Sequence, residues 1–190
     1  MGLRAVVVGI PGVGKTTVVD KVVSGFEGAR LANFGTLMLE TGIASKVVKH
    51  RDEMRKLPVD KQRRLQKAAA SKIAKMKEKL VVVDTHLFIR TPEGFWPGLP
   101  FDVVRAMKPT HLVLVEATPD EIASRRAADT TRYRDAVTKE SLAEELALAR
   151  SFLAAASTLT GAPMMIVTNT QGKQDEVAAG LVRMLEGAAE

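Results

Sequence analysis

The chain has 190 residues, of which 46% are hydrophobic and 26% are charged. These values exclude disordered, collagen-like and coiled-coil proteins and predict one soluble globular domain, because this length suffices to bury a single core. Lys and Arg number 28 against 22 Asp and Glu, and the net charge of +6 suggests an anionic partner such as a nucleic acid, an anionic membrane or a phosphorylated small molecule.

The chain contains no cysteine, which excludes disulfides, thiolate metal sites and a cysteine nucleophile. A reducing compartment is the natural interpretation. The first apolar run is too short for a signal peptide, and no later segment reaches a membrane-spanning length without charge. We therefore expect a cytoplasmic protein without a membrane partner.

Short apolar, β-branched runs alternate with helical patterns along the chain. Buried strands are expected at 5–8, 80–83, 111–115 and 164–167, with a weaker candidate at 31–34. Helices are expected at 15–23, 37–48, 61–77, 122–128, 139–159 and 175–185. This alternation is typical of an α/β fold built on a parallel sheet. Segment 91–100 contains three prolines and two glycines, so we expect an irregular, packed loop there that buries its Phe and its Trp.

The segment between the first strand and the first helix satisfies the pattern G-x-x-x-x-G-K-[ST]. It reads Gly-Ile-Pro-Gly-Val-Gly-Lys-Thr-Thr from Gly9 to Thr17. Glycines let consecutive backbone N–H groups turn toward a phosphate, and the helix that follows adds the positive end of its dipole. We expect Lys15 to be exposed and to reach the β- and γ-phosphates, and Thr16 to ligate Mg²⁺. The alternative is a glycine-rich turn followed by an accidental Lys-Thr pair.

Asp84 ends a run of buried strand residues. It therefore stands at the carboxyl end of that strand, which is the edge where open α/β sheets bind their ligands. In P-loop proteins a carboxylate at this place holds Mg²⁺ directly or through water. The alternative is a polar turn residue or helix cap.

The positive charge is concentrated in one segment. Residues 46–79 carry 13 Lys and Arg against 4 Asp and Glu, so the rest of the chain is slightly acidic. The segment is either a solvated helical face or a patch that meets phosphate. Arg51 and Arg55 are four residues apart and could grip one phosphate together. Without interleaved aromatic residues, the segment is weak evidence for nucleic-acid binding.

A second group of arginines surrounds the sequence Asp129-Thr-Thr. Its members are Arg125, Arg126, Arg132 and Arg134. Phosphoryl transfer requires the spreading negative charge to be neutralised, and arginines on a closing lid can do this while excluding water. The alternative is a set of surface ion pairs, such as Arg134 with Asp129 or Asp135.

Taken together, these segments resemble an archaeal-type adenylate kinase, a P-loop nucleoside monophosphate kinase, over nearly the whole chain. Besides the P-loop, the resemblance rests on segments 51–57, 84–92, 98–100 and 129–134. It implies reversible, Mg²⁺-dependent phosphoryl transfer between ATP and AMP, giving two ADP. It also implies the P-loop NTPase fold, with a five-stranded parallel sheet flanked by helices, and a homotrimer.

The resemblance further implies one adenylate kinase domain over residues 1–190. Its core would comprise 1–34, 80–128 and 136–190, its helical AMP-binding insert about 35–79, and its short lid about 129–135. Segment 92–100 would help to wall the AMP adenine pocket.

The resemblance assigns site residues by position. The ATP-binding residues are Gly9, Ile10, Pro11, Gly12, Val13, Gly14, Lys15, Thr16, Thr17 and Asn169. The AMP-binding residues are Thr36, Arg51, Arg55 and Arg90. The catalytic residues are Lys15, Arg125, Arg132, Arg134 and Arg150. The metal ligands are Thr16 and, through water, Asp84.

Two other functions compete with this interpretation. One is a P-loop kinase that phosphorylates CMP, UMP or a non-nucleotide acceptor. The other is an RNA-associated ATPase of ribosome assembly, which the basic segment motivates. We favour two nucleotides as the partners and disfavour a nucleic acid, because the excess charge belongs to one helical segment.

Overall fold

A parallel sheet of five strands forms the centre of the molecule. The computed structural model describes residues 2–91, 93–128 and 138–188, without the side chain of Arg55. The sheet order is β2–β3–β1–β6–β7, and every neighbouring pair is parallel. The bounds of these strands are β1 Leu3–Val8, β2 Ala29–Asn33, β3 Leu80–Asp84, β6 His111–Glu116 and β7 Met164–Thr168.

The central strands are buried on both faces, which explains their largely apolar sequences. All six residues of β1 are buried, and so are the first four of β3 and the last five of β6. Valine is frequent in these strands because its branched side chain packs well on a pleated surface. The α/β class and the five strands expected from the sequence are confirmed.

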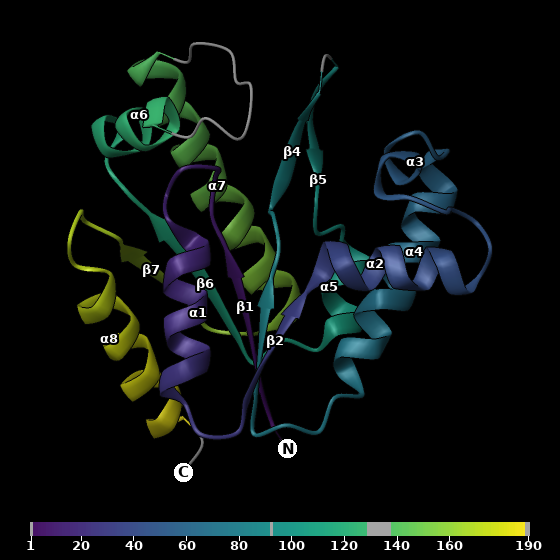
Figure 1. The fold of residues 1–190 in the computed structure, drawn as a ribbon, viewed down its shortest axis with the longest axis horizontal. Coiled ribbons are helices and arrows are strands. Elements are labelled where there is room, and N and C mark those ends of the chain that lie inside the picture. Colours follow the sequence, from purple (N-terminus) through teal and green to yellow (C-terminus); the bar gives the residue numbers. More distant parts are fainter. Residues whose placement is uncertain (1, 92, 129–137, 189–190) are drawn as a thin grey trace.

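Helices cover both faces of the sheet. Helices α1 (Lys15–Gly25) and α8 (Gln174–Gly187) pack together on one face, and α7 (Lys139–Thr160) lies on the other (Figure 1). Helix α5 (Phe101–Met107) packs between α7 and α4 (Val59–Ala74). The six helices expected from the sequence are present. Within the described residues, no helix is both long and apolar enough to cross a membrane.

The basic segment and the helix that precedes it form a helical projection beside β2. The projection comprises α2 (Phe34–Ala44), α3 (Arg51–Arg55) and α4, and it stands to one side of the sheet in Figure 1. Helix α6 (Pro119–Ala128) follows β6 and stands on the other side of the carboxyl edge of the sheet. The carboxyl edge of the sheet therefore lies between two helical segments that are far apart in sequence. The expected lid at 129–135 falls outside the described residues.

The expectation of an irregular loop at 91–100 is wrong. Strands β4 (Phe88–Thr91) and β5 (Gly94–Pro97) pair as an antiparallel hairpin above the sheet (Figure 1). Proline is tolerated because Pro97 ends its strand, and Gly94 adopts a φ of 123° at the start of β5. Phe95 and Trp96 are also not buried, being 40% and 39% exposed. Phe95 instead packs edge-to-face on Phe88, at 5.1 Å between ring centroids.

The two shortest helices, α3 and α5, were not expected from the sequence. They contain five and seven residues, which is too short for a helical period to show in the pattern. Helix α5 is held by its contacts with α4 and α7, and it buries Val103, Val104 and Met107 between them.

Candidate active site

The segment from Gly9 to Thr17 forms a loop between β1 and α1, as its pattern predicts. Gly14 stands at the start of α1 with a φ of 79°, which favours glycine, and Gly12 has a φ of 94°. A Cβ atom on Gly14 would lie 2.4 Å from the Asn169 side-chain nitrogen. Asn169 can therefore approach the loop this closely only because residue 14 has no side chain.

Lys15 is buried rather than exposed, which corrects the expectation from the sequence. Its side chain is 9% exposed, and its ammonium group contacts the Asp84 carboxylate. Burial lowers the pKa of Lys15 to about 8, because the charged form loses its hydration. Asp84 therefore compensates a charge that the protein interior disfavours.

Asp84 and Thr16 are the two side chains expected to supply oxygen ligands to a metal ion. Asp84 ends β3, and Thr16 is exposed on the first turn of α1. Within the described residues, no three His, Cys, Asp or Glu side chains are grouped closely enough to hold a metal by themselves. One hydroxyl and one carboxylate fit Mg²⁺, which keeps several waters and binds phosphate oxygens together with few protein ligands.

Two arginines of α6 bind the backbone of the P-loop. Arg125 donates to the Val13 carbonyl from Nη1 (3.1 Å) and to the Asn169 carbonyl from Nη2 (2.9 Å). Arg126 donates to the Pro11 carbonyl from Nε (2.8 Å). The expected catalytic residue Arg125 is thus placed at the P-loop, where its donors hold the loop against the end of β7.

Asn169 lies beneath the P-loop and is fully buried. Its Nδ2 donates to the Val13 carbonyl at 2.8 Å, and its backbone N–H donates to the Glu116 carbonyl at 2.7 Å. Among the described residues its Oδ1 has no hydrogen-bond partner. The side chain of Asn169, an expected ATP-binding residue, therefore contacts the phosphate-binding loop itself.

Arg150 is held by a carboxylate that the sequence analysis missed. Its Nε and Nη2 donate to the two oxygens of Glu116 at 2.8 and 2.6 Å, a bidentate pair that keeps the pKa of Arg150 above its usual value. Glu116 is the last residue of β6 and is buried. The pair therefore places Arg150 near the carboxyl edge of the sheet.

Glu145 of α7 is a second functional residue that the sequence analysis missed. Its buried carboxylate meets Arg126 Nη2 at 3.3 Å and Arg90 Nη1 at 3.4 Å. It thereby joins an arginine of the P-loop side to an expected AMP-binding arginine. The helical spacing of Glu145 could have indicated its burial, since it shares the apolar face of α7 with Leu142, Leu146 and Ala149.

The remaining expected AMP-binding residues are only partly brought together. Arg51 Nη2 donates to Thr36 Oγ1 at 3.3 Å. Arg90 is 63% exposed and lies 5.9 Å from the centre of the Phe95 ring. Arg55 lies in α3, but its side chain is not described. The expected lid residues Arg132 and Arg134 also lie outside the described residues.

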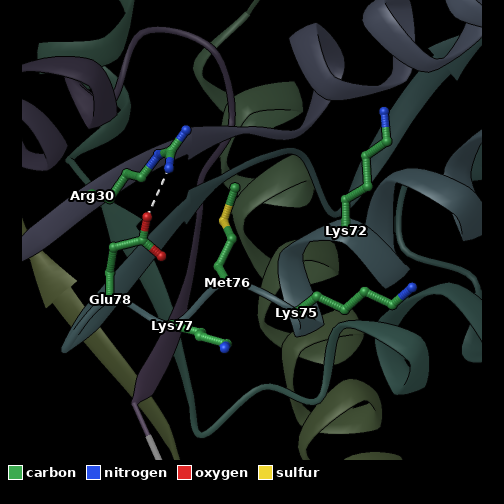
Figure 2. Close-up of a pocket in the computed structure, with 6 residues that line it drawn as sticks. All are labelled: Arg30, Lys72, Lys75, Met76, Lys77 and Glu78. Atoms are coloured by element: carbon green, nitrogen blue, oxygen red, sulfur yellow. Dashed lines mark hydrogen bonds and ion pairs between the residues drawn. The ribbon is translucent and has the colours of Figure 1, made fainter.

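A surface hollow at the opposite edge of the sheet collects further basic residues. It is lined by Arg30, Lys72, Lys75, Met76, Lys77 and Glu78, near the start of β2 and β3. Arg30 pairs with Glu78 at 2.7 Å, whereas the ammonium groups of Lys72 and Lys75 point away from that pair (Figure 2). This part of the basic segment therefore forms a solvated surface without converging charges.

Comparison with known proteins relates the whole chain to one group of enzymes. A family model described as an AAA domain matches residues 8–143. A protein of Thermoplasma acidophilum named adenylate kinase is 43% identical over 96% of this chain and 98% of its own length. Adenylate kinases of Methanocaldococcus jannaschii and Pyrococcus furiosus are also 43% identical, over 95% and 98% of this chain and 97% and 96% of their own lengths.

Solved structures of P-loop kinases share the fold. A shikimate kinase from Bacteroides thetaiotaomicron superposes with a TM-score of 0.62 at 15% identity, covering 97% of this chain and 98% of its own. A shikimate kinase from Acinetobacter baumannii gives the same TM-score at 14% identity, covering 99% of this chain and 95% of its own. At these identities the likeness concerns the fold alone.

The close approach at Gly14 predicts a specific sensitivity to a single methyl group. Gly14→Ala should lose about 3 kcal/mol of unfolding free energy, because the new Cβ collides with buried Asn169. Gly172→Ala is the matched control, since Gly172 has a φ of 80° but no atom within 4 Å of the added Cβ. It should lose only about 1 kcal/mol of backbone strain. Equal losses in urea denaturation would contradict this packing.

The two arginine contacts of Glu145 predict that its charge stabilises the fold. Glu145→Gln should cost about 3 kcal/mol, because Arg126 is only 12% exposed and would keep an uncompensated charge. Glu144→Gln, at an exposed position of the same helix, should change stability by less than about 0.5 kcal/mol. Chemical denaturation of both variants measures the difference, and similar values would show that the Glu145 contacts contribute nothing.

Proposed function

Because this chain belongs to the family of archaeal adenylate kinases, we propose that the carboxyl edge of its sheet performs their reaction, reversible phosphoryl transfer between ATP and AMP to give two ADP. The main support for locating the reaction there is the contact between Lys15, in a complete P-loop, and Asp84 at the end of β3. A buried cation and a carboxylate side by side at the carboxyl edge of the sheet support a site there for a triphosphate and its metal.

On the donor side, the P-loop binds the phosphates of ATP through its backbone N–H groups and Lys15. The triphosphate competes with Asp84 for the Lys15 ammonium, which then neutralises charge on the transferring group. Mg²⁺, when bound, would neutralise the phosphate oxygens further, and Thr16 and Asp84 would hold it. Arg125 and Asn169 keep the Val13 carbonyl turned toward the protein.

On the acceptor side, Arg90 and Arg51 bind the AMP phosphate. The exposed Arg90 guanidinium forms an ion pair with Glu145, and Arg51 donates a hydrogen bond to the Thr36 hydroxyl. Two arginines from different elements can hold one phosphate in line with the donor, which is what transfer requires. Thr36 and Arg55 complete the set that the family resemblance assigns.

Arg132, Arg134 and Arg150 would neutralise charge during transfer. Arg132 and Arg134 belong to the expected lid and carry this role from the family resemblance alone. Arg150 is supported by its position at the carboxyl edge, where Glu116 directs its guanidinium. Residues 35–79 and 129–135 are accordingly proposed as the AMP-binding insert and the lid of one domain.

An assay of acceptor specificity tests this proposal. With ATP and Mg²⁺, the protein should form ADP with AMP faster than with equal concentrations of CMP or UMP. Lys15→Ala should reduce this rate by about 1000-fold, because the transferring group loses its main cation. Circular dichroism should show that the variant keeps its fold. ADP formation without AMP dependence would contradict the proposal, and RNA binding with a steep salt dependence would favour an RNA-associated ATPase.

We also propose a cytoplasmic homotrimer, as the family resemblance implies. Exposed Met164, Ile166 and Leu159, at and beside the outer strand β7, offer an apolar surface for such an assembly.

Light scattering should therefore give a mass three times the 20.5 kDa of one chain. Met164→Lys should lower that mass, because it places a charge in the apolar surface. A wild-type mass of 20.5 kDa would rule the trimer out.

A further inference from the structure

Asn33 stands at the junction of the donor and acceptor halves of the site. It is the last residue of β2, its register partner in β3 is Asp84, and it caps α2, the helix that precedes the basic segment. Neither the P-loop pattern nor the family resemblance assigns it a role. Its position nevertheless places one side chain between the carboxylate of the donor side and the first turn of the acceptor side.

The Asn33 carboxamide forms hydrogen bonds through both its nitrogen and its oxygen. Its Nδ2 donates to Asp84 Oδ2 at 3.0 Å, while its Oδ1 accepts from the Thr36 backbone N–H at 3.0 Å and from Thr36 Oγ1 at 3.1 Å. The opposite amide orientation would set an oxygen against a carboxylate and an NH₂ group against an N–H donor. The chemistry of the partners therefore fixes this orientation.

These bonds complete a continuous chain of polar contacts across the site. Lys15 contacts Asp84 through Oδ1, Asn33 holds Oδ2 of the same carboxylate, and Arg51 donates to the Thr36 hydroxyl at 3.3 Å. The chain begins at the P-loop and ends at an arginine of α3. One carboxamide joins its two halves.

We propose that Asn33 is a positioning residue that sets the orientation of the Asp84 carboxylate and fixes its position relative to the first turn of α2. With Oδ2 held by Asn33, Oδ1 is directed toward Lys15 and the phosphate-binding loop. The same side chain fixes where α2 begins, and hence where Thr36 lies. This inference rests on the proposed function, because it concerns the geometry from which phosphoryl transfer proceeds.

Two substitutions separate this role from simple helix capping. Asp and Ser cap helices about as well as Asn, so Asn33→Asp and Asn33→Ser should keep the start of α2. Both lose the amide donor to Asp84: the serine hydroxyl is too short to reach it, and the aspartate sets a second negative charge against it.

The expected result is a loss of kcat with acceptor binding retained. Asn33→Ser should lower kcat about 10-fold, as for a lost hydrogen bond to a charged group, and Asn33→Asp about 100-fold. Calorimetric titration with AMP alone should give affinities within about threefold of wild type, because the Thr36 contacts remain. Ser157→Ala, which removes a 2.8 Å side-chain hydrogen bond at the far end of α7, is the control and should leave kcat unchanged.

Two results would overturn the proposal. One is a kcat for Asn33→Ser within twofold of wild type, which would show that the Asp84 carboxylate does not need the Asn33 hydrogen bond. The other is an AMP affinity that falls as far as kcat, which would reduce Asn33 to a helix cap. Failure of the proposed function is distinguishable, because the wild-type protein itself would then form no ADP from ATP and AMP.

Discussion

The contact between Lys15 and Asp84 is the interaction on which the arrangement of the site depends. A lysine in the P-loop must stay charged to bind phosphate, yet this one is buried and its pKa is lowered to about 8. Asp84, from the neighbouring strand, supplies the opposite charge. The parallel pairing of β1 with β3 brings the two groups together, so the sheet topology itself creates the site.

The same principle extends to the arginines around this pair. Glu116 holds Arg150, and Glu145 holds both Arg126 and Arg90. Both carboxylates are buried, whereas the guanidinium groups of Arg90 and Arg150 reach solvent. A buried carboxylate without a cation is costly, so Glu116 and Glu145 keep arginines beside them before a nucleotide arrives. Phosphates then bind to cations whose positions are already set, which reduces the cost of ordering them.

Local patterns predicted the parts of this protein that local physics determines. The buried strands, the P-loop and the strand-end position of Asp84 follow from short apolar runs and glycine spacing. The hairpin formed by 88–91 and 94–97 was missed because Pro97 is tolerated only at the end of its strand, which a pattern does not locate. The burial of Lys15 and the roles of Glu145, Glu116 and Asn33 depend on contacts between residues 19 to 69 positions apart, or on topology, and so were not visible in the sequence.

In the proposed reaction, donor and acceptor phosphates meet at the Lys15–Asp84 edge, between the P-loop and Arg90. A crystal structure with an analogue in which two adenosines are joined by five phosphates would show whether they do. We expect Lys15 to contact the phosphate chain near the P-loop, while Arg90 and Arg51 contact its other end. A phosphate chain bound elsewhere, for example over Arg30 and the lysines at the opposite edge, with Lys15 still paired to Asp84, would contradict it.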